Sequence, residues 1–362
     1  MADTQAFQTQ GVTPPDFGEP ARAFAAATTT VERYHLDAVA GRWLVLMFFG
    51  SLGNDASVTA LAEALARRDL FNDRDAAFFG VSIDSADRTE RGIACSPPGV
   101  RFFWDFDASV SNLYGLVGHG HLRPAIFLID PAFRIVMAED IAATGAVLDR
   151  LEAELAAMPP PDEQPFAPVL ILPRVLETGL CAELIACFEA GTPSASGFSI
   201  DAGGRTVQRL NPDLKRRSDV MITDEGLIAA LRTRLETRLF PMVRRAFGWQ
   251  ARHIERYLIC RYDAADQGFF FPHRDDVTLG TAHRKFAVTL NLNAGDYDGG
   301  ELRFPEFGRR TYRPPTGGAC VFACNLLHEA TPVTRGTRYA VVPFLYDDDG
   351  ARLRAANLAR VD

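Results

Sequence analysis

The sequence predicts two domains of different fold class, an α/β domain with a mixed sheet followed by a helix-supported β-barrel or jelly roll. In the first half, apolar runs of strand length alternate with segments of helical spacing. In the second half, helical segments come first, and short apolar runs separated by Gly, Pro and Asp follow them. The length of 362 residues also exceeds what one hydrophobic core usually serves.

Composition and charge are those of an ordinary globular protein, 47% hydrophobic and 23% charged. The net charge of −8 argues against a general nucleic-acid binder, because phosphate binding needs a basic face. The first residues lack the features of a secretory signal, and the longest apolar run, 43–49, is too short to span a bilayer. The six cysteines include no CxxC pair, which favours reduced thiols. We therefore expect a cytoplasmic protein without a membrane segment.

The first half contains the alternating elements of an α/β domain. Apolar residues recur at helical spacing in 57–71 and again in 145–158. The segment 124–140 predicts a hairpin with its turn at Asp130-Pro131. Further apolar runs predict strands at 43–49, 76–84 and 100–107.

A proline-rich stretch, AAMPPPDEQPFAP at 156–168, separates the two halves. Three consecutive prolines followed by acidic and polar residues are typical of a stiff, solvated connector. We therefore place the first domain at 1–157, the linker at 158–167 and the second domain at 168–362.

The second half begins with helical segments at 181–190 and 225–247. Short apolar runs with turn residues between them then predict strands at 253–262, 285–293, 300–306, 318–324 and 337–347. Helices followed by five or more evenly spaced strands are typical of a helix-supported jelly roll.

Three residues in this half have the chemistry of a metal site. His273 and Asp275 are two positions apart, so on an extended segment both side chains leave the same face. His328 follows 53 residues later, after several predicted strands. Two imidazoles and one carboxylate that leave three coordination positions open form the facial triad of non-haem Fe(II) oxygenases. By itself, the His-x-Asp pair favours a surface turn over a metal site, and the surrounding residues reverse that preference.

Arg338 follows His328 by ten residues and would begin a strand that points back into the barrel. A buried guanidinium there can bind the distal carboxylate of 2-oxoglutarate through two parallel hydrogen bonds. The alternative is a surface arginine beside a strand, and Arg335, next to the turn glycine, fits that description better.

Around the triad, a series of motifs follows in order. It comprises Tyr262, Gly268, Phe270, His273-Arg274-Asp275, Asn291-Leu292-Asn293, Gly299-Gly300-Glu301, Phe304, Pro315, Gly318, Phe322, His328, Pro332-Val333, Gly336 and Arg338. The run from 257 to 346 therefore resembles the prolyl 4-hydroxylase-like group of Fe(II)/2-oxoglutarate-dependent oxygenases, and 166–256 resembles the helical support segment of that group.

This resemblance implies a double-stranded β-helix, the jelly roll of these oxygenases, and iron ligation by His273, Asp275 and His328. It implies a salt bridge from Arg338 to 2-oxoglutarate and a hydrogen bond to the same cosubstrate from Tyr262. Asn291 falls where the family usually has a tyrosine that touches the distal carboxylate, so its contact with 2-oxoglutarate is left open.

The implied reaction uses O2 and oxidatively decarboxylates 2-oxoglutarate to succinate and CO2, with ascorbate in a supporting role. The resemblance implies hydroxylation of a peptidyl, by analogy prolyl, or small-molecule substrate.

The first half resembles the thioredoxin-like redoxins, nearest to the peroxiredoxin branch, through PPDFGEPARAF, the strand and helix from 43 onward, and RPAIFLIDPAFRIV. Redoxins carry a nucleophilic cysteine at the start of the helix after the first core strand. Here that region reads GSLGNDAS, with no cysteine before Cys95, and neither Ser51 nor Ser57 can replace a thiolate. We therefore expect a non-catalytic domain that serves binding, homodimer formation or substrate presentation. Arg123-Pro124 is a candidate cis bond by the same resemblance.

Two other functions remain open. One is a redox protein that uses Cys95, although a loop thiol is the preferred interpretation. The other is a thiol-independent redoxin-fold scaffold or binding protein with a metal-binding barrel. We interpret His119 and His121 as loop residues and His253 and His283 as surface or turn residues. The cluster LKRRSDV (214–220) is usually a solvated face, but in the oxygenase family such a segment can border the active-site entrance and touch an anionic or peptide substrate through Arg216 and Arg217.

Overall fold

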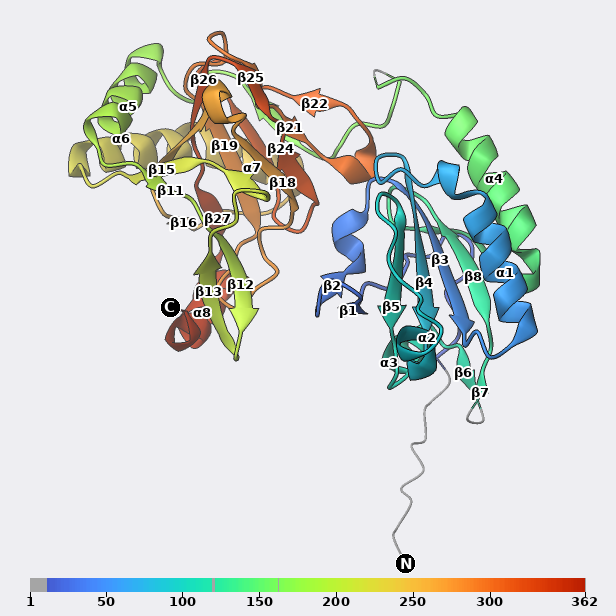
Figure 1. Ribbon diagram of the computed structural model, residues 1–362. Coiled ribbons are helices and arrows are strands. Elements are labelled where there is room, and N and C mark those ends of the chain that lie inside the picture. Colours follow the sequence, from blue (N-terminus) through green and yellow to red (C-terminus); the bar gives the residue numbers. More distant parts are fainter. Residues whose placement is uncertain (1–11, 119–120, 162, 362) are drawn as a thin grey trace, which may run out of the picture. The chain divides into compact units, whose positions relative to one another are not determined.

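The computed structural model describes residues 12–118, 121–161 and 163–361. These residues form two compact units, the first reaching Gln164 and including Pro305–Gly308, the second comprising Pro165–Phe304 and the residues from Arg309 onward (Figure 1). Each unit has its own hydrophobic core. None of the described helices is long and apolar enough to cross a membrane.

The N-terminal unit is built on a seven-stranded mixed sheet in the order β2-β1-β5-β4-β3-β8-β9. The central strand β3, Trp43–Gly50, is parallel to β4 and antiparallel to β8, and all of its residues are buried. Both faces of this strand are covered, which explains its continuous apolar sequence. One face packs against α1 and α4, which also lie against each other (Figure 1).

The remaining strands of this unit are β1 (Ala25–Thr28), β2 (Tyr34–His35), β4 (Ala76–Ser82), β5 (Val100–Trp104), β6 (Val117–Gly118), β7 (His121–Leu122), β8 (Ala125–Ile129) and β9 (Ile135–Glu139). The helices are α1 (Asp55–Ala66), α2 (Ser85–Thr89), α3 (Ser109–Leu113) and α4 (Thr144–Ala156), with short 3-10 turns η1 (Leu36–Val39), η2 (Arg68–Leu70) and η3 (Ile141–Ala143). The predicted mixed-sheet redoxin fold and the hairpin of β8 and β9 are confirmed. The candidate cis bond is wrong: Arg123-Pro124 is trans, and the cis bond of the described chain joins Pro97 and Pro98.

The C-terminal unit is an antiparallel jelly roll of two facing sheets supported by helices. The larger sheet runs β10-β23-β19-β26-β17-β15-β11, with β16 and β27 beside this path, and the smaller runs β14-β18-β24-β21-β22. Residues alternate along each strand of the larger sheet. Ile259, Val288 and Val341 face the helices, whereas Cys260, Tyr262 and Ala340 belong to the core cluster between the sheets. The predicted jelly roll is confirmed.

The strands of the larger sheet are β10 (Leu170–Leu172), β11 (Ser194–Ala195), β15 (Ser218–Met221), β16 (His253–Glu255), β17 (Leu258–Asp263), β19 (Phe286–Asn291), β23 (Ala319–Ala323), β26 (Thr337–Val341) and β27 (Phe344–Tyr346). Those of the smaller sheet are β14 (Lys215–Arg216), β18 (Phe269–His273), β21 (Leu302–Arg303), β22 (Thr311–Tyr312) and β24 (His328–Ala330). Two further pairs are β12 (Phe198–Ala202) with β13 (Arg205–Arg209), and β20 (Asp298–Gly299) with β25 (Val333–Arg335).

The supporting helices are α5 (Thr178–Ala190), α6 (Glu225–Arg234), the π-helical turn η4 (Leu235–Leu239) and α7 (Phe240–Phe247). The C-terminal residues form α8 (Asp348–Asn357), and short turns occur at η5 (Ala264–Asp266), η6 (Pro305–Phe307) and η7 (Leu358–Arg360). The helices and strands that the sequence predicts are present, whereas α8 and the β12–β13 hairpin are not anticipated by any pattern used above.

Candidate metal centre

Two strands of the smaller sheet bring the three candidate ligands together. His273 ends β18, His328 begins β24, and these two residues are directly paired across the strands. Asp275 lies in the turn after β18, with its carboxylate oxygens 3.6 Å from Nε2 of His273 and 3.3 Å from Nε2 of His328. The three potential ligand atoms all lie within 4.8 Å of one another. The structure therefore brings together residues that are separated by up to 55 positions.

Hydrogen bonds fix the orientation of both imidazoles. Nδ1 of His273 lies 2.7 Å from the carbonyl oxygen of Phe271, and Nδ1 of His328 lies 3.0 Å from that of Leu326. A carbonyl oxygen can only accept, so each Nδ1 carries the hydrogen. Nε2 is therefore the ring nitrogen of each histidine that faces the centre and could bind a metal.

The protonation states also suit a cation. Burial and the neighbouring His273 lower the pKa of His328 to about 4, so its imidazole is neutral near pH 7. Burial alone would raise the pKa of Asp275, but its contacts with the two imidazoles outweigh burial and hold that pKa well below its usual value. Two imidazoles and one carboxylate are the donor set of a non-haem ferrous site, so these residues fit iron.

The backbone of Asp275 is held on both sides. Its N–H donates to the carbonyl oxygen of Cys324 at 2.9 Å, and its own carbonyl accepts from Arg284 at 3.3 Å. Arg284 is in turn bound by both carboxylate oxygens of Glu255, at 2.6 and 2.8 Å. No sequence pattern indicated this support, because Glu255 and Arg284 lie on segments that meet only in the folded barrel.

Arg338, Tyr262 and Asn291 meet between the two sheets. Tyr262 of β17 is paired with Arg338 of β26, and the guanidinium carbon lies 5.2 Å from the centre of the Tyr262 ring. Arg338 is 3% exposed, and its Nε has no hydrogen-bonding partner among the described residues. A buried guanidinium of this kind calls for an anion. By contrast, Arg335 pairs with Asp298 on the surface and is 62% exposed on its side chain.

Asn291 holds Arg338 in place. Its amide oxygen accepts from a terminal nitrogen of Arg338 at 3.4 Å, and its amide nitrogen donates to the carbonyl oxygen of Pro314 at 2.9 Å. The amide is thus occupied at both ends. Its contact with 2-oxoglutarate stays a prediction, but its contact with Arg338 is observed.

One interpretation of surface residues is wrong, and a second holds only in part, because His283 lies in a turn as predicted but is not on the surface. In the LKRRSDV segment, Lys215 is 8% exposed and the Arg217 side chain is 6% exposed, so this is not a solvated face. His283 is buried and lies 2.8 Å from Glu255. His253 remains a partly exposed strand residue, paired with Asp348. The pairing of β14 with β18 buries Lys215, and local sequence does not reveal such pairing.

The other candidates give no second metal centre. His119 lies outside the described residues, and His121 belongs to the short strand β7. Cys95 is in a loop and partly exposed, and all six cysteines are free thiols. Within the described part of the chain, only His273, Asp275 and His328 form a group of three or more potential ligands close enough to share an ion.

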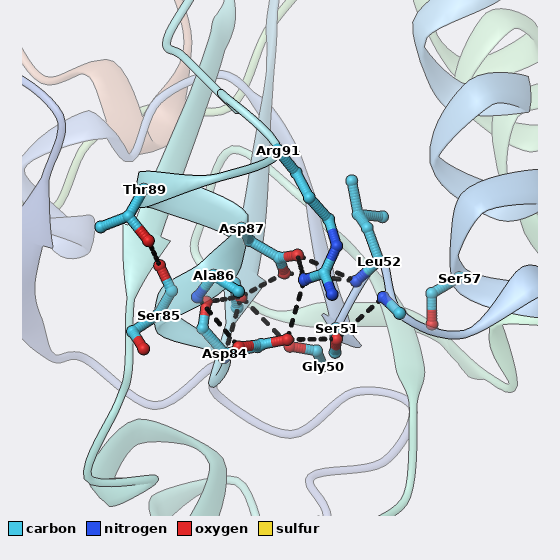
Figure 2. A network of polar contacts seen from close by, with 12 residues as sticks. Gly50, Ser51, Leu52, Ser57, Asp84, Ser85, Ala86, Asp87, Thr89 and Arg91 are labelled. Carbon is cyan, nitrogen blue, oxygen red and sulfur yellow. Dashed lines mark hydrogen bonds and ion pairs between the residues drawn. The ribbon is translucent and has the colours of Figure 1, made fainter.

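In the N-terminal unit, the hydroxyl groups of Ser51, in the loop after β3, and of Ser57, in α1, are engaged in hydrogen bonds; Figure 2 shows those of Ser51. Ser57 is 1% exposed and donates to the carbonyl oxygen of Phe49 at 2.7 Å. Ser51 donates to Asp84 at 2.7 Å and accepts from the N–H of Gly53 at 2.9 Å. Ser57 thus ties α1 to the end of β3, and Ser51 holds the loop that follows this strand, in keeping with a domain that lacks the redoxin nucleophile.

A buried carboxylate anchors the same loop. Asp87 has a fully buried side chain that accepts from the N–H of Leu52 at 3.1 Å, from the hydroxyl of Ser82 at 2.6 Å and from Arg91 at 2.6 Å (Figure 2). Arg91 also binds Asp84, whose pKa falls to about 2 through hydrogen bonds from Ser51 and Arg91. This network holds the loop after β3 against α2.

We expect Asp87→Ala to destabilise the N-terminal unit by about 2–4 kcal/mol, because it leaves the N–H of Leu52 without its acceptor and removes the shortest hydrogen bonds of Ser82 and Arg91. The lower part of that range allows for solvent screening at Arg91, whose side chain is 34% exposed. Denaturant unfolding of the full chain would measure the change. The control is Asp84→Ala, which removes a carboxylate that is 31% exposed and should cost less. Equal losses in both variants would contradict the anchoring role of Asp87.

Comparison with known proteins also finds two different families in the two halves of the chain. Residues 257–346 match the model of the 2OG-Fe(II) oxygenase superfamily, and residues 17–138 match that of the AhpC/TSA family. A PKHD-type hydroxylase of Synechococcus sp. (strain JA-2-3B'a(2-13)) is 34% identical over 128 residues, which cover 34% of this chain and 53% of the relative. This chain thus spans about half the length of that curated relative.

Two other similar proteins extend the comparison. The multifunctional procollagen lysine hydroxylase and glycosyltransferase LH3 of Rattus norvegicus is 34% identical over 192 residues, covering 51% of this chain and 24% of the relative. A viral collagen prolyl hydroxylase from Paramecium Bursaria Chlorella virus-1 is 16% identical, with a TM-score of 0.36, over 49% of this chain and 96% of that structure.

Proposed function

We propose that this chain, whose C-terminal unit belongs to the 2OG-Fe(II) oxygenase superfamily and whose N-terminal unit is an AhpC/TSA-type redoxin domain, hydroxylates an unactivated carbon of a peptidyl or small-molecule substrate. The observation that carries the proposal is the convergence of His273, Asp275 and His328. Their donor atoms are those that a ferrous ion binds.

In the proposed reaction each residue has a defined task. His273, Asp275 and His328 would hold ferrous iron and leave coordination positions open. When bound, iron supplies the activation of O2 that couples decarboxylation of 2-oxoglutarate to oxidation of the substrate. Arg338 would bind the distal carboxylate of 2-oxoglutarate, and Tyr262 would donate a hydrogen bond to the same molecule.

The substrate class rests on the relatives. Among them, the rat protein is named as a procollagen lysine hydroxylase, so its name points to a protein substrate. We extend this to the present chain as a proposal, with prolyl hydroxylation as one form of it. The N-terminal unit would then serve substrate presentation, binding or pairing with a second copy, without thiol chemistry of its own.

The test is succinate release from 2-oxoglutarate by the full chain. We expect release to require Fe(II), to be supported by ascorbate, to stop when the metal is removed by a chelator, and to return when Fe(II) is added back. Peptide and metabolite mixtures would identify substrates by the gain of one oxygen atom. Iron binding without succinate release would contradict the proposal, and iron-independent peroxide consumption would favour a redox protein instead.

A further inference from the structure

A cavity in the C-terminal unit is lined by one buried arginine, and two further cations contact its lining. The cavity has a volume of about 690 Å³, and its lining includes Ser196, Gly197, Asp219 and Arg256. Lys215 donates to Gly197, and Arg217 donates to Ser196 and Asp219. None of these residues has a task in the function proposed above.

The contacts of the three cations leave positive charge without a counter-ion. Lys215 donates to the carbonyl oxygen of Gly197 at 2.6 Å, a neutral acceptor. Arg217 pairs with Asp219 at 2.7 Å and donates to Ser196 at 2.9 Å. Within the described residues, Nε of Arg256 has no hydrogen-bonding partner and Arg256 forms no ion pair. One carboxylate thus faces three cations.

The carboxylates closest to this cluster do not neutralise its positive charge. Asp219 is engaged by Arg217 and Ser196, although its Oδ1 has no partner within the described residues. Glu255, beside Arg256 in the sequence, is held by Arg284 and His283. The guanidinium of Arg256 instead lies 4.7 Å from the centre of the Phe344 ring, which Arg284 also contacts at 3.9 Å.

Burying cations without an anion costs free energy, and the protonation equilibria reflect this cost. Burial and then the charge of Arg217 lower the pKa of Lys215 well below its usual value. Burial, followed by repulsion from Arg284 and Arg217, lowers the pKa of Arg256 to about 10. An anion in the cavity would relieve both penalties.

The cluster lies close to the candidate metal centre. The ammonium of Lys215 lies 4.3 Å from the centre of the Phe270 ring. The same ring stacks on His273, with 3.5 Å between centroids and 22° between planes. A single aromatic ring therefore separates Lys215 from a proposed iron ligand, so an anionic group held by the cluster would place the rest of its molecule near the reacting centre.

We propose that this cavity binds a carboxylate or phosphate group of the primary substrate, with Lys215 and Arg256 as its counter-charges. The part of the inference that concerns the substrate rests on the oxygenase function proposed above. The anion site itself does not, because it can be measured in the metal-free protein.

The first experiment titrates the metal-free full chain with inorganic phosphate, with aspartate that is acetylated at its amine and amidated at its carboxyl end, and with the asparagine counterpart. We expect saturable binding of an anion and none of the asparagine compound. Binding of phosphate, of the aspartate compound or of both identifies the anion class. Lys215→Met and Arg256→Met should each weaken binding about tenfold, the loss expected from one charge-assisted hydrogen bond.

The matched control is Arg335→Met, which removes one positive charge at an exposed ion pair and should leave anion binding unchanged. Circular dichroism checks folding, and if one cavity variant fails to fold, the other still decides the outcome. Absence of saturable binding would overturn the proposal. So would binding that survives in Lys215→Met and Arg256→Met but is lost in Arg338→Met, because the anion would then occupy the cosubstrate pocket.

The second experiment tests the substrate class with iron and 2-oxoglutarate present. Proline and lysine peptides flanked by aspartate are compared with the same peptides flanked by asparagine, and the gain of one oxygen atom is measured. We expect the acidic peptides to be preferred and the preference to be lost in Lys215→Met. Equal oxidation of both sets, or oxidation of neither, would overturn the assignment of the anion to the substrate. Absence of succinate release from the wild-type chain in every mixture would instead contradict the oxygenase function and leave the first titration valid.

Discussion

Asp275→Ala is expected to abolish Fe(II)-dependent succinate release, with a loss well beyond 100-fold. Removal of a residue that only supports a metal ligand typically costs roughly 10–100-fold, so loss of the sole carboxylate ligand should cost more. The substitution leaves two imidazoles whose ring centres are 4.2 Å apart, without the negative charge that offsets a divalent cation. Metal affinity, measured by calorimetry with Mn(II), should fall together with turnover.

Asp276→Ala provides the matched control for this prediction. Asp276 is the next residue and is also partly buried, but it does not belong to the cluster of potential ligands. Its replacement should leave metal affinity close to that of the wild type. If Asp275→Ala retained wild-type Mn(II) affinity and turnover, the site would lie elsewhere in the chain.

The metal centre could be predicted from sequence because its geometry is largely local. His273 and Asp275 are two positions apart, and the turn that follows β18 is short, so the pair comes together whatever the rest of the barrel does. Only His328 required a long-range assumption, namely that β24 lies beside β18, and the motif order around it supplied that assumption. The barrel strands could likewise be predicted from their apolar pattern in the sequence.

The cationic cluster could not be predicted, because its burial depends on strand register. Lys215 is buried where β14 pairs with β18 at Phe270, 55 positions later, and Arg217 is covered beside β15, which pairs with β17. In the linear sequence these residues stand in a polar run, where solvent exposure is the ordinary outcome. His283 lies in a turn, one of its two predicted positions, but its burial against Glu255, 28 positions earlier, could not be predicted either.

The N-terminal unit shows the opposite case, in which an absence in sequence was informative. The missing cysteine predicted a domain without thiol chemistry, and in the structure Ser51 before α1 and Ser57 within it are hydrogen-bonded. The central carboxylate, Asp87, had no signal in the sequence, because an aspartate in a short polar helix is usually exposed. The burial of this polar group could therefore be seen only in the structure, although the fold of the domain was predictable from the sequence.

Arg338→Met is expected to raise the KM for 2-oxoglutarate by roughly 30-fold or more while iron affinity stays unchanged. Removing one partner of a buried, charge-assisted pair costs roughly 2–5 kcal/mol, much of it because the other charge is left unpaired. Arg338 is 3% exposed and its Nε has no other partner among the described residues, so water cannot readily take over its role. KM and kcat from succinate release, with calorimetric titration of 2-oxoglutarate into Mn(II)-loaded protein, would measure the effect.

Two further variants separate charge from packing. Arg338→Lys keeps the charge but loses the planar fork, so it should recover part of the affinity for 2-oxoglutarate. Arg335→Met removes an exposed charge three residues away and should change neither KM nor metal binding. The distinction matters because Asn291 and Tyr262 both contact Arg338, so a purely structural role would lower stability in Arg338→Met without a selective change in KM. An unaltered KM in a folded Arg338→Met would show that the cosubstrate carboxylate binds to a different cation.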